Sequence, residues 1–257
     1  MYSQKSLRCL GIVILLCFTS IIHGQVFNIE KRRIASEKSG AWLGSANMSF
    51  AGSKSTKSTV AIAAGTLIEY KSKDTLNLWL FVTDFRLVTG NKEKFSDNGF
   101  AHILYNYKVS KAVRWEIFTQ LQYNSLTKLQ RQFLLGTGPR FKLTQYETAK
   151  FYFGAAYMFE YEEISDSTML HHDHRANSYF TFTLNPEETV SFSSTTYVQP
   201  LLTDLSDYRI SNETNLSLDI SKKLTLNVTF QYFYDSRPPV EVPKNIYSFS
   251  NGLNLEF

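Results

Sequence analysis

The chain has 257 residues, 43% of them hydrophobic and 15% aromatic, and a formal net charge of +4. This length suits one large β domain or two ordinary domains. Its two cysteines are Cys9 and Cys17, so the sequence beyond them excludes a disulfide framework and a cysteine-ligated metal site. Basic residues are scattered except at Lys31–Arg33, a distribution that argues against a nucleic-acid partner.

The N-terminus has the organisation of a secretory signal. Lys5 and Arg8 precede an apolar run that ends at Ile22, and Gly24 supplies a small residue for cleavage before Gln25. The alternative, a retained anchor, is disfavoured because the run is short for a membrane-spanning helix. We expect residues 1–24 to be removed, which lowers the formal charge from +4 to +2 because two basic residues and no acidic ones are lost. Residues 25–41 are polar and weakly patterned, and we expect a periplasmic N-terminal segment there.

From Trp42 onward, stretches of alternating polar and apolar residues follow one another, as in β-strands. They predict twelve strands: Trp42–Ala51, Ser58–Lys71, Thr75–Thr89, Gly99–Val109, Val113–Asn124, Gln132–Leu143, Lys150–Glu162, His174–Leu184, Thr189–Gln199, Tyr208–Ile220, Leu224–Asp235 and Tyr247–Phe257. In the third of these, Asp84 and Arg86 interrupt an apolar face, which predicts a bulge or an early exit from a membrane.

The length and spacing of these strands indicate a membrane barrel. Most match the roughly 9–11 residues that a tilted membrane strand needs. Tight turns alternate with longer polar connections at Gly90–Asn98, Glu163–Asp173 and Ser236–Ile246, and an even strand number places both ends on the short-turn side. The predicted fold class is therefore all-β, a transmembrane antiparallel up-and-down β-barrel of about twelve strands over residues 42–257, in the outer membrane.

The two faces of the strands support this interpretation. In Leu224–Asp235 the apolar face alternates with a face of threonine, asparagine and glutamine. A water-soluble sandwich, the alternative, would instead carry its charges outward on short strands. The last strand ends on Phe257, which resembles the signal read by the barrel-assembly machinery, so we expect that machinery and outer-membrane lipid to be partners.

Candidate chemistry is sparse. His171–His174 contains metal-ligand residue types, but adjacent residues on a predicted loop seldom converge on one ion, so a solvated loop is the simpler interpretation. No serine and histidine are placed as a nucleophile and its base, and no phosphate-binding loop is present. We therefore expect no enzymatic activity, no catalytic residue, no metal and no cofactor.

The polar face of the central strands is the better functional candidate, because small barrels fill their interior with side chains and a narrow polar lumen is one outcome. The selected lumenal residues are His102, Asn106, Arg114, Glu116, Gln120, Gln122, Arg131, Arg140 and Glu160. A channel or small-ligand site and a plug of salt bridges remain equally open. Gly136 and Gly138 share this face, where a bare backbone leaves room for a large neighbour such as Arg140.

Part of the chain resembles a known family. The residues that carry the resemblance are Phe100–His102, Tyr105–Tyr107, Glu116–Phe118, Gln120, Gln122–Asn124, Arg131 and Leu135–Phe141, with weaker likeness at Asn28–Arg33 and Gly40–Gly44. They are similar to the YdiY-like salt-induced outer membrane protein family, a domain of unknown function, in its Bacteroidetes-type form. The resemblance implies an outer-membrane β-barrel and assigns no catalytic residue.

The expected function is a narrow solute or ion pore, or an envelope-stress structural component. Two alternatives stay open: an outer-membrane lipid-modifying enzyme, and a surface adhesin or binding protein that uses the loops at Gly90–Asn98 and Ser236–Ile246.

Overall fold

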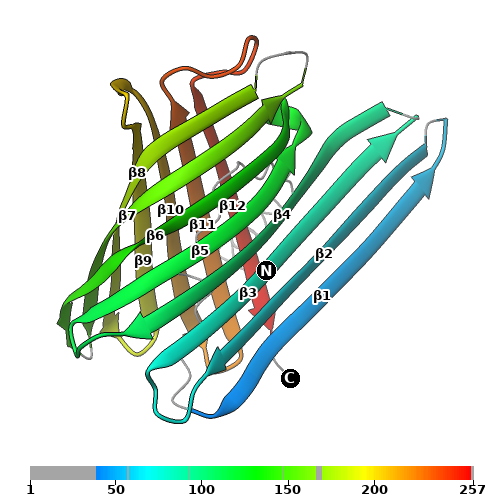
Figure 1. Ribbon diagram of the computed structural model, residues 1–257. Helices are drawn as coiled ribbons and strands as arrows, with labels where there is room; N and C mark the ends of the chain where they lie inside the picture. The colour runs from blue at the N-terminus through cyan, green and yellow to red at the C-terminus, as the bar shows by residue number, and fades with distance from the viewer. Residues whose placement is uncertain (1–38, 57, 92, 147, 166–169, 256–257) are drawn as a thin grey trace, which may run out of the picture.

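The computed structural model describes residues 39–56, 58–91, 93–146, 148–165 and 170–255 (Figure 1). The expected signal peptide, residues 25–38 of the expected periplasmic segment and Phe257 lie outside them. The strands are β1 Ala41–Lys54, β2 Ser58–Lys71, β3 Asn77–Gly90, β4 Glu93–Lys108, β5 Val113–Asn124, β6 Leu129–Gln145, β7 Ala149–Ile164, β8 Leu170–Glu187, β9 Val190–Leu201, β10 Asp204–Ser221, β11 Leu224–Asp235 and β12 Asn245–Leu255. A single 3-10 turn, η1, covers Ser125–Thr127. Among the described residues, no helix is long and apolar enough to cross a membrane.

The twelve strands form one sheet in which each strand pairs antiparallel with the next in sequence. The predicted all-β, antiparallel up-and-down architecture of twelve strands is confirmed. Residue 41, assigned from the sequence to the preceding segment, already belongs to β1.

Two of the predicted long connections are largely strand. β4 begins at Glu93 and β8 at Leu170, so both strands continue several residues further than the alternation predicted. The reason is that these extensions are mostly polar, with Phe95 and Leu170 as isolated apolar residues, so no apolar-polar alternation marks where the strand begins. Ser236–Lys244, between β11 and β12, is the longest connection between described strands.

We call the end of the sheet that carries Ser236–Lys244 the loop rim. The opposite end, where β1 starts and β12 stops, is the terminal rim.

The sheet is strongly curled. The hydroxyl of Tyr179 on β8 donates to Glu116 Oε2 on β5 at 2.7 Å, although three strand spacings separate them. In a flat sheet that separation is roughly 14 Å, which these side chains cannot bridge. Figure 1 shows β5–β12 curled into a strongly bent sheet, with β1–β3 extending to one side. Within the described residues, pairing runs from β1 to β12 and no ladder joins these two edge strands.

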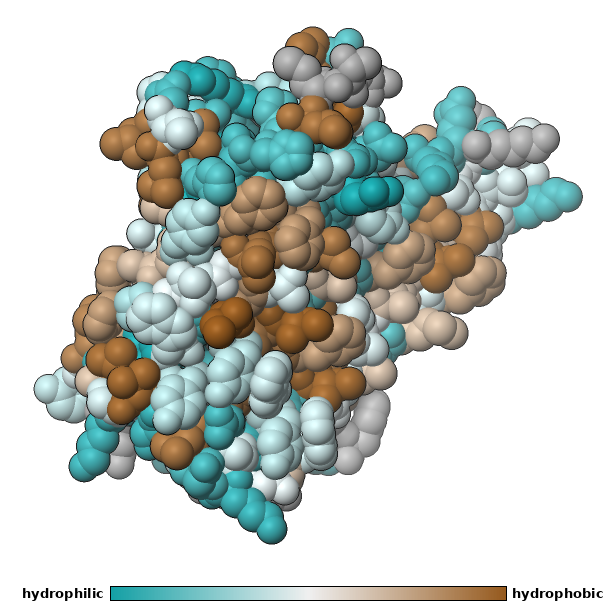
Figure 2. Space-filling view, in the orientation of Figure 1, coloured by the Kyte–Doolittle hydropathy of each residue, from teal (hydrophilic) through white to brown (hydrophobic). Residues whose placement is uncertain are grey.

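The convex face is apolar and rich in aromatic rings. Its exposed residues include Trp79, Phe81, Ile103, Trp115, Ile117, Phe153, Phe180 and Phe230. Figure 2 shows this apolar surface lying between hydrophilic ends of the molecule.

The concave face is mostly polar on β5–β11 and apolar on β3. Leu80 and Val82 on β3 point inward and form a buried cluster with Phe100 and Leu104 of β4. The predicted bulge near Asp84 is absent: β3 pairs regularly with β4 there and continues to Gly90, and the irregular pairing lies at Val88–Thr89. The apolar inner face of β3 therefore fills part of the interior.

Candidate functional site

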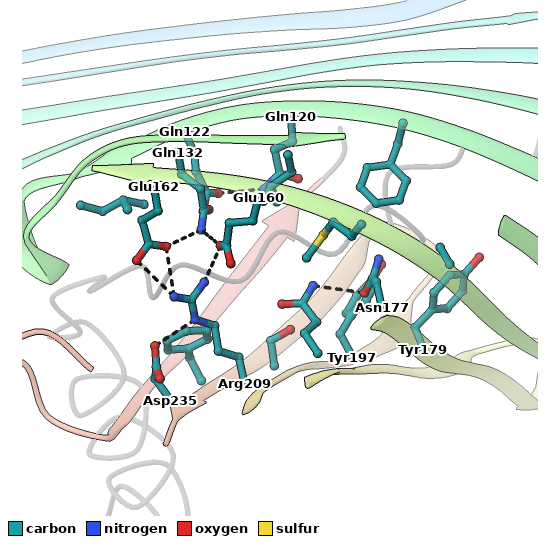
Figure 3. Close-up of a pocket in the computed structure, with 18 of the residues that line it drawn as sticks. Gln120, Gln122, Gln132, Glu160, Glu162, Asn177, Tyr179, Tyr197, Arg209 and Asp235 are labelled. Atoms are coloured by element: carbon teal, nitrogen blue, oxygen red, sulfur yellow. Dashed lines mark hydrogen bonds and ion pairs between the residues drawn. The ribbon is translucent and has the colours of Figure 1, made fainter. Parts of the chain in front are cut away.

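A cavity of about 140 Å³ lies on the concave face, between strands β4–β11 and the loop Ser236–Lys244 (Figure 3). This space is large enough for several water molecules or one small solute. Its polar lining includes His102, Gln120, Gln122, Gln132, Glu160, Glu162, Asn177, Tyr179, Tyr197, Gln199, Arg209 and Asp235. Leu104, Phe118, Leu134 and Met158 form an apolar part of the same wall.

A chain of side-chain hydrogen bonds crosses this wall from β4 to β7. His102 Nδ1 donates to Gln120 Oε1 at 3.1 Å, and Gln120 Nε2 donates to Gln122 Oε1 at 2.9 Å. Gln122 Nε2 then donates to Gln132 Oε1. Gln132 Nε2 in turn donates to Glu160 Oε1 and to Glu162 Oε2, the second bond being 2.8 Å long. An amide oxygen only accepts, so His102 carries its proton on Nδ1. Every donor in the chain is directed towards the two carboxylates.

Those carboxylates belong to a buried ionic cluster that we call the mouth network. It consists of Glu160, Glu162, Asp173, Arg175, Asp207, Arg209 and Asp235, near the loop rim. Arg209 contacts Glu160 at 2.5 Å, Glu162 at 3.1 Å and Asp235 at 3.0 Å. Arg175, with 2% of its side chain exposed, contacts Glu160 at 2.6 Å and Asp207 at 3.0 Å.

The mouth network joins β7, β8, β10 and β11 across the lumen. Five carboxylates and two guanidinium groups give it a formal charge of −3, from −5 and +2. Buried ion pairs of this kind are costly to break when one partner is removed. The network therefore narrows the interior and holds these four strands in a fixed arrangement.

The charges near the terminal rim have the opposite sign. Glu116 accepts from Asn106 Nδ2 at 2.7 Å and lies 3.8 Å from Arg140 Nε. The Arg140 guanidinium also lies 3.8 Å from the centre of the Tyr152 ring, within range of a cation–π interaction. Arg114 Nη1 donates to Asn106 Oδ1 at 2.9 Å. Arg114 and Arg140 outweigh Glu116, so these residues of the concave face are net basic, whereas the mouth network near the loop rim is acidic.

The proline-rich loop Ser236–Lys244 reaches into the cavity. Pro238, Pro239, Val242 and Pro243 line it beside Arg209. Glu241, in the left-handed backbone region at φ +70°, accepts from Lys128 Nζ at 2.5 Å, and Lys128 follows η1 on the opposite side of the mouth. This ion pair ties the loop across the opening.

Replacing Lys128 with methionine is expected to loosen the loop. A cysteine placed at Ser211, which lines the cavity, should then react roughly twofold faster with a water-soluble thiol reagent, a small effect because the ion pair is exposed. The predicted mature chain has no other cysteine, so the label reports one position. Lys94→Met is the matched control, because it breaks an ion pair with Asp97 that does not involve the loop.

Acid should have the same effect as the substitution. The hydrogen bond and charge of Lys128 lower the pKa of Glu241 below its ordinary value. A lowered carboxyl pKa means that the pair is intact above the ordinary glutamate range and is lost as the pH falls through the lowered value. Because the thiolate is the reacting form, the rate is compared with that of Lys128→Met at the same pH. The ratio of the rate in the Lys128-containing protein to the rate in Lys128→Met should rise towards one in acid. A ratio that does not change with pH would contradict the proposed tie.

The structure places eight of the nine selected residues on the concave face. The prediction that Arg131 lies there is wrong: it points to the convex face, with 64% of its side chain exposed and Glu163 Oε1 at 3.8 Å. The cause is the alternation of β6, in which Gln132 points inward and residue 131 therefore points outward.

The histidine segment also differs from the prediction. His171–His174 lies in β8 rather than in a loop, and His174 packs against Tyr157 and Phe159 on the convex face. Over the residues that the structure describes, no group of three or more histidine, cysteine, aspartate or glutamate side chains could hold a metal ion.

Several residues of the mouth network were not selected from the sequence. Arg175 lies on the same strand face as Asn177 and Thr181, so the alternation of β8 could have identified it. Asp235 ends β11 and Arg209 lies in the first half of β10, and the contact of Arg209 with Glu160 on β7 depends on the curl of the sheet.

Residues 46–257 match the family described as "Protein of unknown function, DUF481". Among curated proteins no match was found. A solved structure described as "NanC porin structure in rhombohedral crystal form" superposes with a TM-score of 0.47 and 11% sequence identity, covering 84% of this chain and 99% of that chain.

Proposed function

The chain belongs to the DUF481 family, and we propose that it forms an outer-membrane β-barrel whose lumen is a narrow passage for small solutes. The finer assignment, to YdiY-like members of Bacteroidetes type, is part of this proposal. We also propose that the protein acts by letting solutes pass along its charged interior and not by catalysing a reaction.

The membrane location is supported by the convex face. Its exposed leucine, isoleucine, phenylalanine and tryptophan side chains suit hydrocarbon, and strands of 11–18 residues are long enough to cross it when tilted. In lipid, an open sheet edge would leave backbone groups unsatisfied at a cost of several kcal/mol each. We therefore propose that β1 and β12 pair in the membrane and close the barrel. The expected signal peptide and the last strand would direct export and assembly.

One observation supports passage most directly: a polar cavity lies on the inside of a curled sheet whose outside is apolar. The passage is narrow for three reasons. The mouth network crosses it, the loop Ser236–Lys244 covers one end, and the cluster around Leu80 fills the side at β3–β4. Wide aqueous pores need about 16 strands or more.

Liposome swelling tests the proposal. Vesicles that contain the folded protein should swell in isotonic glycine or glucose and should remain unchanged in an isotonic tetrasaccharide, because only the smaller solutes fit the cavity. Vesicles with no protein, or with protein added unfolded, are the controls. A lack of swelling with every solute would instead favour a structural component stiffened by the mouth network.

The adhesin alternative relies on two long loops. Most of Gly90–Asn98 belongs to a strand, so Ser236–Ile246 is the loop left to support it. The lipid-modifying alternative predicts altered lipid spectra in cells that lack the protein. Unchanged spectra would remove it.

A further inference from the structure

One part of the cavity wall consists of neutral polar side chains from β8, β9 and β10. Asn177, Gln199 and Ser211 lie there, and we call these three residues the neutral wall. Gln199 Nε2 donates to Asn177 Oδ1 at 3.1 Å (Figure 3). Ser211 is opposite Tyr197, the inward-facing residue of β9 next to Gln199. The bond from Gln199 fixes which way the Asn177 amide points, with its nitrogen as the group left over.

The neutral wall has hydrogen-bonding groups that the rest of the protein does not use. Asn177 is only 6% exposed, yet its Nδ2 makes no hydrogen bond to any residue that the structure describes. Within the same described ranges, the hydroxyl of Ser211 makes none either. Buried polar groups in proteins are nearly always hydrogen-bonded. These two groups therefore point to a partner that occupies the cavity.

The ionised groups of the mouth network that line the cavity are, in contrast, engaged with one another. Both oxygens of Glu160, Glu162 and Asp235 accept hydrogen bonds from a glutamine, a guanidinium group or a backbone N–H. Arg209 donates from each of its three guanidinium nitrogens. A charged solute would have to compete with these pairs, and the formal charge of −3 on the mouth network would also repel an anion.

Strand β5 adds further amide donors beside apolar side chains. Gln120 and Gln122 each donate one hydrogen bond along the chain that leads to β7. A primary amide has two N–H groups, so each of these glutamines keeps a second donor. Leu134 and Met158 line the same cavity. The cavity thus offers neutral donors and acceptors together with an apolar surface, which is the lining that a small uncharged polar molecule needs.

We propose that this cavity binds a small neutral solute with several hydroxyl groups, a polyol or a monosaccharide, through Asn177, Ser211 and the glutamines of β5. The inference names the solute class of the proposed passage and rests on that enclosed lumen, but binding does not require conduction. A hydroxyl group both donates and accepts, so it matches amide and serine groups alike. A site built in this way rejects an analogue without hydroxyl groups, because its own polar groups are then left unpaired.

Binding is tested on the full mature chain, folded in deuterated detergent micelles and titrated with glycerol and with glucose, by saturation-transfer NMR. The expected result is saturable transfer to at least one of these solutes. Tetrahydropyran, the ring of glucose without its hydroxyl groups, should not displace it. Asn177→Leu keeps the size of the side chain but removes the amide, and should weaken the affinity about tenfold. Asn227→Leu is the matched control, the same exchange at an inward-facing asparagine of β11 outside the cavity lining, and should leave the affinity unchanged.

The outcomes separate the alternatives. Equal weakening by Asn227→Leu would overturn the site, and so would a lack of saturable binding by both neutral solutes, which would leave the neutral wall to water alone. Saturable binding of methylammonium or acetate in their place would assign the cavity to an ion and also overturn it. Should Asn177→Leu fail to fold, Ser211→Ala decides, with an expected loss of several-fold. Binding without vesicle swelling would retain this site while removing the proposed passage, and swelling without binding would do the reverse.

Discussion

Replacing Arg209 with methionine is expected to lower the free energy of unfolding by about 3–5 kcal/mol. The guanidinium contacts Glu160, Glu162 and Asp235, whose side chains are 1%, 9% and 8% exposed. Methionine fills much of the space but leaves three buried carboxylates facing one another. The measurement is urea unfolding in micelles, followed by the tryptophan fluorescence of Trp42, Trp79 and Trp115.

Two variants separate electrostatics from packing. Adding Glu162→Gln to Arg209→Met removes one of the three carboxylates, and should restore part of the lost stability. Arg237→Met breaks an exposed ion pair with Asp204 at the same rim and should leave the unfolding midpoint unchanged. A loss of stability in Arg209→Met equal to that in Arg237→Met would contradict the role given to the mouth network.

The second large effect is expected at Gly138. A Cβ at this position would lie 2.1 Å from the Ala155 carbonyl oxygen and 2.5 Å from Ala156 Cα, both backbone atoms of β7. Pro139 follows, and the ladder between β6 and β7 skips from Thr137 to Arg140. Gly138→Ala should therefore force the two strands apart and reduce the yield of folded barrel several-fold, as expected for overpacking against rigid backbone.

The readout is the fast-migrating folded band in gels run without heating. Gly252→Ala provides the matched control, because it adds the same methyl group to an inward-facing strand glycine with no atom within 4 Å. The control should fold with unchanged yield. An equal yield from Gly138→Ala would mean that β6 and β7 are not closely spaced there.

The glycines also illustrate what the sequence could reveal. Their place on the concave face of β6 was predicted from alternation, but the room they leave was assigned to Arg140. In the structure Gly136 faces the Phe118 ring and Gly138 the backbone of β7. Alternation identifies which face a residue occupies, whereas the neighbour across that face depends on strand register.

The strand count, pairing order and most lumenal residues were predictable because the side-chain period of two is strong from β5 to β11. Arg131 is the exception. It lies one residue before the predicted strand Gln132–Leu143, so the alternation did not say on which face of the sheet its side chain lies. The ion pair between Arg209 and Glu160 joins strands three apart, and the loop at Pro238 turns inward. The ion pair and the inward turn of the loop both depend on how strongly the sheet curves. The alternation of polar and apolar residues along one strand carries no information about that curvature.

The central claim is that the curled sheet encloses a narrow passage through the membrane. Single-channel recording in a planar lipid bilayer tests it most directly, with protein first shown to be folded by its gel migration. The predicted result is discrete current steps much smaller than those of a wide 16-stranded pore recorded alongside, and altered in size by Arg209→Met. Silent bilayers containing the same folded protein would contradict the claim.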